Sequence, residues 1–558
     1  MSEEIVQKTV RSDMLIIGGG LSGCLAAIRA RNLGASVVIV EKMGFERCGS
    51  AGSGIDHYRA YTSDKSIMPD SPSIEQLVDE QNKYYEGIVN EEIVKMVYEG
   101  TVPLMRNLEE MGISFRSPSG KLRIVDKNDI NFPGRDIKPK LSRLVRVKGV
   151  KIYDRIMITK ILTAGNRFLG ATGFNIRSGE FLLFVAKTGI LATGTFHRLY
   201  PNPTGIMSNT VLPTSLTGDC LIAAFRAGVE VTNLEFTGSI IGPRHFHRGT
   251  GITSFIPGKL VNAKGDNIFG THRAMTNLTQ ALLNEVNSGR GPAYMDCTKI
   301  PDNEMDIMRW SLGHEGGGKA FLDYLRDNHI DLKKHKIEFG EYERNHMMEG
   351  EGVVVDNDFK TSIKGLFAAG DIVAGLRLFA PGAVVMGWVA GEKAAKYAQS
   401  GNLTDPISEQ VTSEKERVFN PLTSSSRIYW QEMQTALENL MQFYTGGIRN
   451  EGLLSAGLVR VNEIKRRYAG CLKANNPHEL MRVHEVLNLF DIAELVIKAA
   501  LLRKESSRTP YHYRSDYPKQ SSEYRKFIIL RREGETIIHD LRPPVLIQSK
   551  HAAAKRPW

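Results

Sequence analysis

The sequence predicts an α/β protein in which a parallel-sheet domain is interrupted by an insertion and followed by helices. Three observations support this prediction. Residues 14–42 read as a strand, a glycine-rich turn, a helix and a second strand, the opening unit of a Rossmann-type domain. Residues 236–354 show little alternation of strand and helix patterns, as expected of an inserted α+β region. Residues 428–502 repeat apolar side chains every three or four positions, the spacing of packed helices.

The glycine-rich turn GGGLSG fits the pattern GxGxxG, whose glycines have separate structural tasks. Gly18 permits the tight turn, Gly20 lets the backbone approach a pyrophosphate, and Gly23 lets the helix pack closely against the strand. The pyrophosphate is then expected at the positive end of the helix. Glu41, at the end of the second strand, is placed to accept hydrogen bonds from ribose hydroxyls. The unit therefore predicts a dinucleotide site.

Two later segments, together with the GGGLSG turn, indicate that the dinucleotide is FAD. Strands within residues 188–195 (TGILATGT) and 365–375 (GLFAAGDIVAG) return the chain to the nucleotide. Asp371, in the second of them, can hydrogen-bond a polyol, and FAD has a ribityl chain where NAD has none. The small residues at 49–54 cannot fill a core and are expected to lie against the flavin ring. The predicted cofactor contacts are Gly18, Gly20, Leu21, Ser22, Gly23, Glu41, Lys42, Arg47, Gly49, Ser50, Ala51, Gly52, Ser53, Gly54, Ala192, Thr193, Gly194, Asp219, Gly370, Asp371, Ala383 and Val384.

The length of 558 residues is too great for one hydrophobic core and implies several domains. We expect an FAD-binding domain over residues 1–235 and 355–405, with a capping domain over 236–354 between its halves. A polar, loop-like bridge over 406–427 is expected to lead into a helical domain over 425–504. Residues 505–558 are expected to form a C-terminal extension that can dock a partner.

Charge, cysteines and hydropathy narrow the function classes. The net charge of +10 favours an anionic substrate or an acidic partner, and without a zinc finger or an RNA-binding signature nucleic acid is not expected. The five cysteines form no CxxC pair, so we expect no zinc or iron–sulfur site within the chain itself. The N-terminus is polar, and no apolar run approaches the ~18 residues of a membrane helix. We therefore expect a cytoplasmic protein without a transmembrane segment.

Basic side chains crowd the last part of the chain. They are Lys504, Arg508, Arg514, Lys519, Arg525, Lys526, Arg531 and Arg532. Two interpretations remain open: a docking face for an acidic protein, or a solvated surface without a partner.

The first catalytic candidates follow the glycine-rich segment directly, on the side of the flavin where a substrate should lie. Asp56 or His57 can move a proton, since a carboxylate beside an imidazole can be tuned toward neutral pH. The alternative is a hydrogen-bonded pair that supports the loop. Tyr58 is expected to pack rather than to react.

A cationic loop in the inserted region provides further candidates. Its basic side chains lie within five residues: Arg244, His245, His247 and Arg248. They suit an anionic substrate, although a solvated loop is the alternative. Arg377 and His346 are also candidates for the site, and His346 can equally belong to the core. No metal site is expected, because the closest pair, His245 and His247, has no further ligands beside it.

The order of these motifs resembles a known family. GGGLSG, EK, the glycine-rich segment, LATG, LTGDCLIAAFRAGVEVTNLEF, GRGPAYMD, HMMEGEGVVVD, LFAAGD and LLRKESSRTPYHYRSDYP are similar to the flavoprotein subunits of the succinate dehydrogenase and fumarate reductase superfamily. The stretches GPRHFHRGTG, KLVNAKGDNI and RKESSRTPYHYRSDYP are nearest in pattern to the α subunit of adenylylsulfate reductase. The resemblance spans nearly the whole chain.

The resemblance implies FAD, a cap over the flavin, a helical domain and electron exchange with an iron–sulfur, ferredoxin-like β subunit in a hetero-oligomer. Membrane-type members attach FAD to a histidine about where Arg47 falls, so non-covalent FAD is implied here. The position of the family's HPTG histidine falls near Ile240, and that of its catalytic, proton-delivering arginine falls near Gln280. Arg377 is the nearest candidate for the family's substrate arginine. A substrate other than succinate or fumarate is therefore expected.

We accordingly expect an FAD-dependent oxidoreductase α subunit that reduces or oxidises a small anionic or carbonyl-bearing substrate. Alternative hypotheses are an adenylylsulfate reductase α subunit with a variant pocket, and a stand-alone enzyme resembling L-aspartate oxidase or fumarate reductase. A non-catalytic electron-transfer flavoprotein is the alternative from another class.

Overall fold

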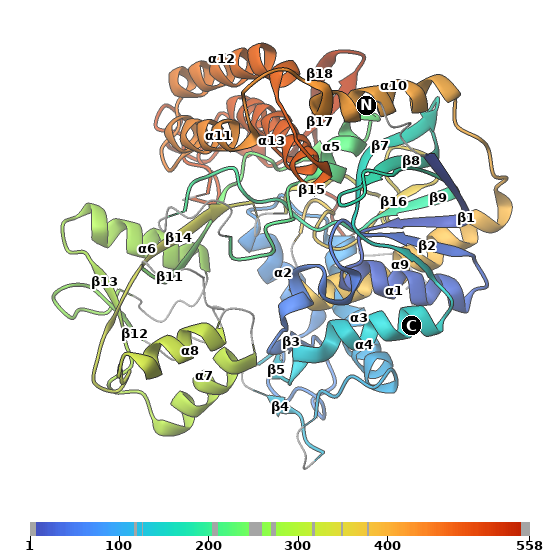
Figure 1. Cartoon of the computed structure of the whole chain (residues 1–558). Helices are drawn as coiled ribbons and strands as arrows, with labels where there is room; N and C mark the ends of the chain where they lie inside the picture. Colours follow the sequence, from blue (N-terminus) through green and yellow to red (C-terminus); the bar gives the residue numbers. More distant parts are fainter. Residues whose placement is uncertain are drawn as a thin grey trace.

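The structure is a computed structural model, drawn in Figure 1. It describes residues 7–116, 120–124, 127–202, 210–244, 259–268, 275–314, 318–346, 350–376, 379–509 and 511–547. Of the predicted site residues, His245 and Arg377 lie outside these ranges, as do His247 and Arg248.

The centre of the molecule is a sheet of seven strands among the described residues, in the order β6-β2-β1-β9-β8-β7, with β16 beside β9. Its strands are β1 (Gln7–Ile17), β2 (Val37–Val40), β6 (Lys151–Tyr153), β7 (Ile156–Ala164), β8 (Arg167–Asn175), β9 (Phe181–Leu191) and β16 (Leu366–Ala368). β1 runs parallel to β2 and β9, and β16 runs parallel to β9, whereas β7 and β8 are antiparallel neighbours. This sheet confirms the predicted α/β, Rossmann-type fold class.

Two helices cover one face of the sheet at its glycine-rich turn: α1 (Leu21–Asn32) and α9 (Phe379–Ser400). They approach each other closely, because a Cβ added at Gly387 would lie 2.3 Å from the carbonyl oxygen of Ser22. The remaining elements of this domain include α2 (Ile74–Tyr84), α3 (Glu91–Glu110), α4 (Ile137–Val147), α5 (Asp219–Arg226), β3 (His57–Arg59), β4 (Arg123–Ile124) and β5 (Asp129–Asn131). Short 3₁₀ helices span Phe45–Arg47, Ser50–Ser53 and Gly134–Asp136.

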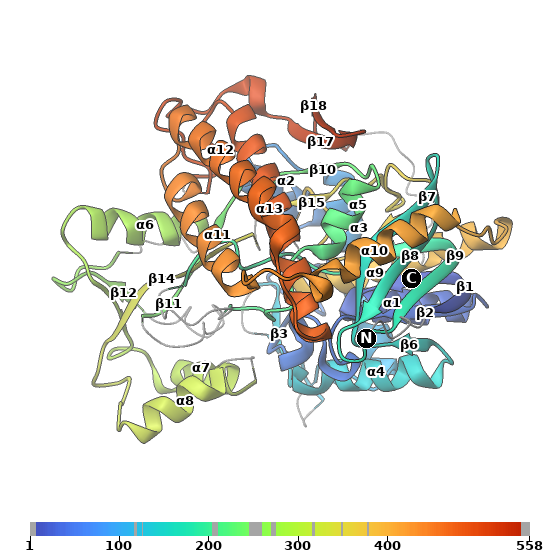
Figure 2. The same ribbon diagram turned by 45° about the horizontal axis from the view of Figure 1, so that its top comes forward.

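The inserted region lies to one side of the central sheet (Figures 1 and 2). Its sheet has the order β11-β14-β13-β12, from β11 (Gly238–Pro243), β12 (Lys259–Val261), β13 (Ala293–Asp296) and β14 (Ile337–Asn345). Its helices are α6 (Met275–Asn287), α7 (Asp302–His314) and α8 (Gly318–Asp327). This region has a hydrophobic cluster of its own, which includes Met295, Leu312 and Phe321. The mixed α+β character agrees with the predicted fold class.

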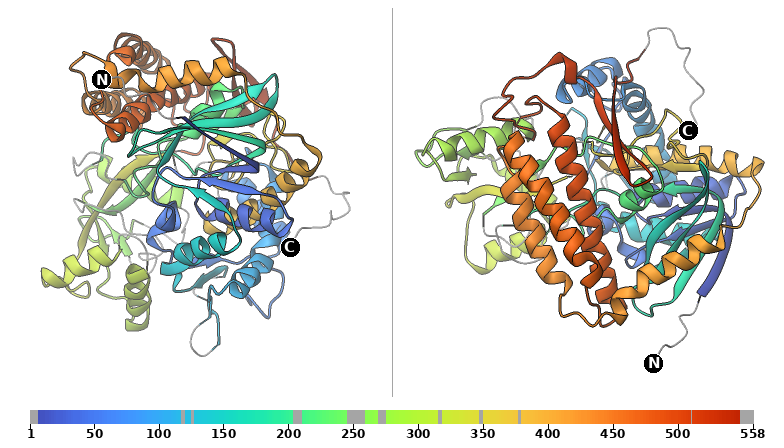
Figure 3. Two further views of the ribbon diagram at one scale, coloured as in Figure 1. Left: turned by 45° about the vertical axis from the view of Figure 1, so that its right-hand side comes forward. Right: turned by 90° about the horizontal axis from the view of Figure 1, so that it is seen from above.

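The helical part contains α10 (Ser408–Thr423), α11 (Trp430–Thr445), α12 (Glu451–Tyr468) and α13 (Pro477–Leu502). Seen from above, α11, α12 and α13 lie side by side (Figure 3). The prediction of a loop-like bridge over 406–427 was wrong, because most of it is helix α10. Val411, Val418 and Phe419 share one buried face of that helix, at a spacing that packs it on the domain.

The chain end returns to the first domain. A hairpin of β17 (Phe527–Glu533) and β18 (Thr536–Arg542) joins β10 (Val231–Thr232) and β15 (Gly352–Val353) in one sheet, in the order β15-β10-β17-β18. Two members of the terminal basic group are not on the surface: Arg508 is 3% exposed and Arg514 is 0% exposed. Their inclusion in a docking face was wrong, since Arg514 pairs with Asp516 and donates to the carbonyl oxygen of Ala500. No helix in the described ranges combines the length and the apolar character of a membrane span.

Candidate functional site

The GGGLSG turn contacts Ala192, which follows β9, and Glu41, which follows β2. Gly18 has φ +105°, and a Cβ there would lie 2.3 Å from the carbonyl oxygen of Ala192, so only glycine fits. Glu41 accepts hydrogen bonds from the backbone N–H groups of Gly19 (2.7 Å) and Met43 (2.8 Å). The predicted ribose acceptor therefore lies directly beside the predicted pyrophosphate turn.

The start of α1 fits an anionic ligand. Its N-cap residue is Gly20, which offers no side-chain acceptor to the first turn. The buried hydroxyl of Ser22 has no hydrogen-bond partner within the described residues. A buried polar group without a partner is rare in native structures and points to a ligand. A pyrophosphate would satisfy both the helix end and this hydroxyl.

The two later strands converge on the same place. The backbone N–H of Ala369 donates to the carbonyl oxygen of Leu191 at 2.9 Å, which joins the end of β16 to the end of β9. A Cβ added at Gly370 would lie 2.9 Å from the Cβ of Ser22. Segments that are about 175 residues apart along the chain, around Ala192–Gly194 and Gly370–Asp371, thus border the same turn, as the sequence predicted. Ala383 and Val384 lie on α9 beside them.

The glycine-rich segment at 49–54 packs against the turn itself. A Cβ added at Gly49 would lie 2.9 Å from the Cα of Gly20, so the two glycine segments touch. Ser50–Ser53 form a 3₁₀ helix, in which Ala51 and Gly52 are buried. Part of the need for small residues therefore comes from the chain's own backbone, in addition to any ligand.

Arg47 hydrogen-bonds to this segment. Its guanidinium donates to the carbonyl oxygens of Gly52 (3.4 Å) and Arg135 (3.3 Å), and it pairs with Asp136 at 3.4 Å. About half of the side chain is exposed.

Lys42 and Asp219, both predicted to touch the cofactor, belong to a buried ionic network. The Lys42 ammonium donates to Thr217 Oγ1 (2.8 Å), Asp219 Oδ2 (2.6 Å) and Glu485 Oε1 (2.9 Å). All three of its donors are used by protein acceptors. Burial alone would raise the pKa of Glu485, but the charges of Lys42 and Arg198 outweigh it and lower that pKa. These side chains join α13 to the first domain through Lys42, which directly follows Glu41.

The predicted Asp56–His57 pair is formed. Asp56 Oδ1 lies 2.6 Å from His57 Nδ1, and Asp56 is fully buried while the His57 side chain is 20% exposed. The other oxygen, Asp56 Oδ2, is buried without a hydrogen-bond partner in the parts of the chain that are described. Strand β3 holds His57 opposite Asn131 of β5. Tyr58 is buried, donates to the carbonyl oxygen of Thr101 and packs on Phe115.

The inserted region contacts the glycine-rich segment next to this pair. A Cβ added at Gly54 would lie 2.8 Å from the carbonyl oxygen of His314, at the end of α7. Asn131 of β5 donates to Ser311 of the same helix at 3.4 Å. Asp56 and His57 therefore lie where the first domain and the inserted region meet.

His346 and Arg244 have different environments. His346 is 1% exposed and stacks on Phe196, with ring centroids 4.7 Å apart. Burial, and then the charge of Arg449, hold its pKa well below the usual value, so its imidazole is neutral at pH 7. Arg244 is half exposed and pairs with Glu338 at 2.8 Å on the outer end of β11.

Arg59 is a residue that the sequence analysis missed. It lies two positions after His57, pairs with Asp129 at 3.2 Å, and places its guanidinium 4.4 Å from the ring centroid of Phe379. Its position in β3 next to the Asp56–His57 pair was the only signal in the sequence.

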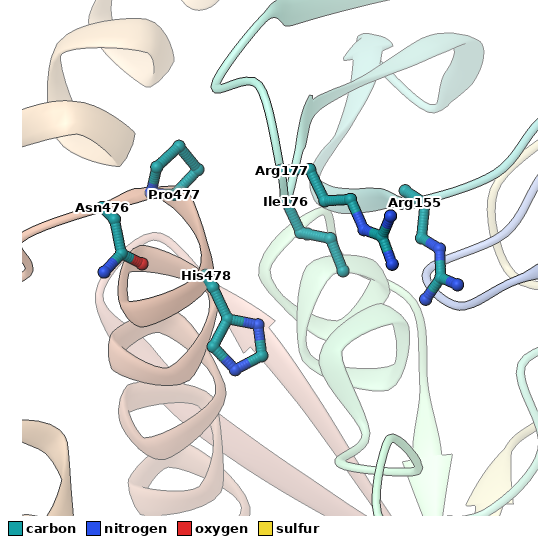
Figure 4. Close-up of a pocket in the computed structure, with 6 residues that line it drawn as sticks. All are labelled: Arg155, Ile176, Arg177, Asn476, Pro477 and His478. Atoms are coloured by element: carbon teal, nitrogen blue, oxygen red, sulfur yellow. The ribbon is translucent and has the colours of Figure 1, made fainter.

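A separate hollow lies between the β8–β9 turn and the start of α13 (Figure 4). It is lined by Arg155, Ile176, Arg177, Asn476, Pro477 and His478. The guanidinium of Arg155 lies near Gly44, where a Cβ would be 3.0 Å from Nη2. None of the predicted site residues that the structure describes lines this hollow.

Comparison with known families identifies the first domain. Residues 13–384 match the family described as FAD binding domain, and residues 434–549 match the family described as fumarate reductase flavoprotein C-term. The chain belongs to the FAD binding domain family. FAD is therefore the cofactor of this flavoprotein, and the flavoprotein fits that cofactor at the GGGLSG turn and at Ser22.

Individual relatives are similar to the flavoprotein over most of its length. The flavoprotein is 26% identical to an uncharacterized FAD-dependent oxidoreductase of Methanocaldococcus jannaschii, over 94% of this chain and 96% of the relative. It is also 26% identical to one of the subunits of fumarate reductase (CoM/CoB) from Methanothermobacter marburgensis, over 94% and 97%. The structure of adenylylsulfate reductase from Archaeoglobus fulgidus superposes with a TM-score of 0.90 at 22% identity, over 99% of this chain and 98% of that one. The flavoprotein is an FAD-dependent oxidoreductase. Its fold is that of the succinate dehydrogenase and fumarate reductase superfamily, as predicted.

Proposed function

We propose that the flavoprotein is the α subunit of an oxidoreductase that reduces or oxidises a small anionic or carbonyl-bearing substrate. In this proposal it exchanges electrons with an iron–sulfur, ferredoxin-like β subunit. The observation that carries the proposal is the buried Asp56–His57 pair where the glycine-rich segment meets the inserted region. The second carboxylate oxygen of Asp56 is buried and accepts no hydrogen bond from the described residues, so no structural role accounts for it.

The residues that would hold FAD are those that converge on the GGGLSG turn. The N-terminus of α1 and Ser22 would bind the pyrophosphate, Glu41 the adenosine ribose, and Asp371 the ribityl chain. The segment at 49–54 would lie against the flavin ring. Arg47 falls about where membrane-type members of the family attach FAD to a histidine, and it contacts Gly52 and Asp136, so the proposal includes non-covalent FAD. Bound FAD supplies hydride exchange with a substrate carbon.

His57 would move the proton that accompanies this exchange. Asp56 holds Nδ1 of the imidazole, which fixes the ring orientation and stabilises its protonated form. The ring nitrogen that Asp56 does not hold is then the one that can exchange a proton with a substrate. The partial exposure of His57, against the full burial of Asp56, supports this division of roles.

The proposed electron partner is supported by charge. The net charge of +10 suits an acidic partner, and Lys504, Lys519 and Arg525 are exposed near the chain end. The relative from Methanothermobacter marburgensis is itself named as part of a multi-subunit enzyme. A pull-down from the native host tests this part: recovery of an iron–sulfur protein supports it, and a flavoprotein that turns over alone with oxygen argues for a stand-alone oxidase.

The function is tested by anaerobic bleaching of the flavin absorbance. The panel is succinate, aspartate, sulfite with AMP, enoates and 2-hydroxy acids, each added to the oxidised protein or, for acceptors, to the reduced protein. The proposal expects a change with at least one small anion outside succinate and fumarate. If no compound changes the flavin, the non-catalytic alternative replaces it. Acid precipitation should release FAD into the supernatant.

A further inference from the structure

Asn345, the last residue of β14, has a buried side-chain amide without hydrogen-bond partners among the described residues. Its side chain is 1% exposed. Within the parts of the chain that the structure describes, neither Oδ1 nor Nδ2 has a hydrogen-bond partner. Burying an amide without partners costs free energy, so such groups are rare unless a ligand pairs with them. Asn345 can donate twice and accept twice.

The register of the inserted sheet defines what lies beside this amide. Asn345 pairs with Gly238 of β11 in the antiparallel ladder, and paired residues lie on the same face. Gly238 has no side chain to cover the amide. Ile240, two residues along β11, lies on the same face, because side chains alternate along a strand and the register is regular here.

Ile240 belongs to an apolar wall. It is 3% exposed and packs with Val211, Leu212 and Phe379. These four side chains carry no charge, so they favour an apolar group of a ligand over a charged one. The wall therefore suits the apolar part of a small ligand.

The same wall contacts Arg59, which lies in the same strand as His57 of the proposed catalytic pair. The guanidinium of Arg59 lies 4.4 Å from the ring centroid of Phe379, and Arg59 follows His57 in β3. On the other side, the residue after Asn345, His346, bridges to Phe196, just beyond Ala192–Gly194 of the proposed flavin site. Asn345 thus lies at the end of the inserted sheet that joins the first domain.

We propose that Asn345 and the wall of Ile240, Val211, Leu212 and Phe379 form the substrate-recognition subsite. This inference rests on the proposed function. The subsite takes a small carboxylate with an apolar remainder and with a hydroxyl or amine next to the carboxylate. Such a ligand offers an acceptor to Nδ2 and a donor to Oδ1 at the same edge, so that it satisfies both halves of the amide.

Two matched probes test the inference: 2-hydroxybutyrate, which carries the neighbouring donor, and butyrate, which lacks it. Their dissociation constants are measured by titrating the flavin absorbance of the FAD-loaded protein under anaerobic conditions. The wild type should bind 2-hydroxybutyrate about tenfold or more tightly than butyrate, because a buried polar group left unpaired is penalised. In Asn345→Leu this preference should disappear. Both probes should bind more weakly than to the wild type, because Nδ2 no longer donates to the carboxylate that they share.

The variant also has a readout that does not depend on a ligand. Replacing an unpaired buried amide by an apolar side chain of similar size should leave the Tm of the FAD-loaded protein unchanged or raise it. Asn328→Leu is the matched control, since Asn328 is an exposed amide after α8 in the same region. It should leave both dissociation constants as in the wild type.

The outcomes separate the inference from the function on which it rests. Equal binding of the two probes by the wild type, or a preference that survives in Asn345→Leu, would overturn the inference while the proposed function stands. A wild type that responds to other compounds of the panel but not to 2-hydroxybutyrate would overturn it as well. A flavin that responds to no compound at all would remove the proposed function and the inference together.

Discussion

The two junctions of the first domain are built differently. At its junction with the helices, buried charges meet opposite charges: Lys42 with Glu485, Arg198 with Glu485, and Arg503 with Glu235. At its junction with the inserted region, Asp56 Oδ2 and both amide atoms of Asn345 are buried without hydrogen-bond partners among the described residues. Arg198 Nε and Glu235 Oε2 at the first junction also lack a hydrogen-bond partner among those residues, so the two junctions differ chiefly in their ion pairs. We infer that the ion pairs of the first junction serve stability, and we propose that the second keeps polar groups available for a ligand.

The largest expected effect is a loss of stability at the junction with the helices. Lys42→Met removes the ammonium that lies between Asp219 and Glu485, and leaves these carboxylates buried with one cation fewer. The free energy of unfolding should fall by about 3–5 kcal/mol, the usual cost of breaking a buried ion pair from one side. Urea unfolding of the FAD-loaded variant measures this loss. A loss below about 1 kcal/mol, the size of a surface pair, would show that the network is dispensable.

At the second junction, Asp56→Asn should act on turnover rather than on stability. The substitution keeps the shape of the side chain but removes the charge that supports a protonated His57. We expect kcat to drop by ~10²-fold or more, with FAD content unchanged. Steady-state kinetics with a substrate from the bleaching panel give the result. An unchanged kcat would reduce the pair to a support for the loop.

The pH dependence of stability separates the junctions in a third way. The pKa of Glu485 is lowered in the folded protein from its ordinary value of 4.5, since Lys42 and Arg198 outweigh the effect of burial. Its stabilising contribution is therefore present above about pH 4.5 and is lost as the pH falls below that value. Denaturation at about pH 6 and about pH 3.5, on either side of that value, measures the free energy of unfolding. Between these two pH values it should fall more for the wild type than for Glu485→Gln. Equal losses would contradict the assignment.

Arg244→Ala should have the smallest effect of the series. Its pair with Glu338 is half exposed, and surface pairs contribute about 0–1 kcal/mol. The Tm of the variant should stay within a few degrees of the wild type. A large drop in Tm would mean that the outer end of β11 is part of the stable core. A large rise in KM at unchanged Tm would instead return Arg244 to the substrate site.

Local patterns predicted the first domain well, and for a physical reason. The close approach of Gly18 to Ala192 and the position of Glu41 beside the turn follow from short motifs whose geometry is nearly fixed. Asp56 and His57 are neighbours in the sequence, so their pairing was also foreseeable. These features depend on residues that are close in the chain or on recurring strand ends.

Contacts between distant segments could not be predicted in this way. Lys42 pairs with Glu485, which is 443 residues away, and nothing local marks that pairing. Arg514 was assigned to the surface on its charge, yet it is buried against a partner two residues away and a carbonyl oxygen of α13. Helix α10 was missed because its apolar face consists of few residues within a polar sequence. Asn345 was missed because an asparagine at a strand end carries no motif.

The most direct test of the account is a crystal structure of the FAD-loaded protein. The account predicts a flavin ring lying against residues 49–54, with no covalent bond to Arg47 and with His57 at the edge of the ring. A map in which the ring lies elsewhere, or in which side chains of the protein fill the space beside Gly49 and Gly52, would contradict it.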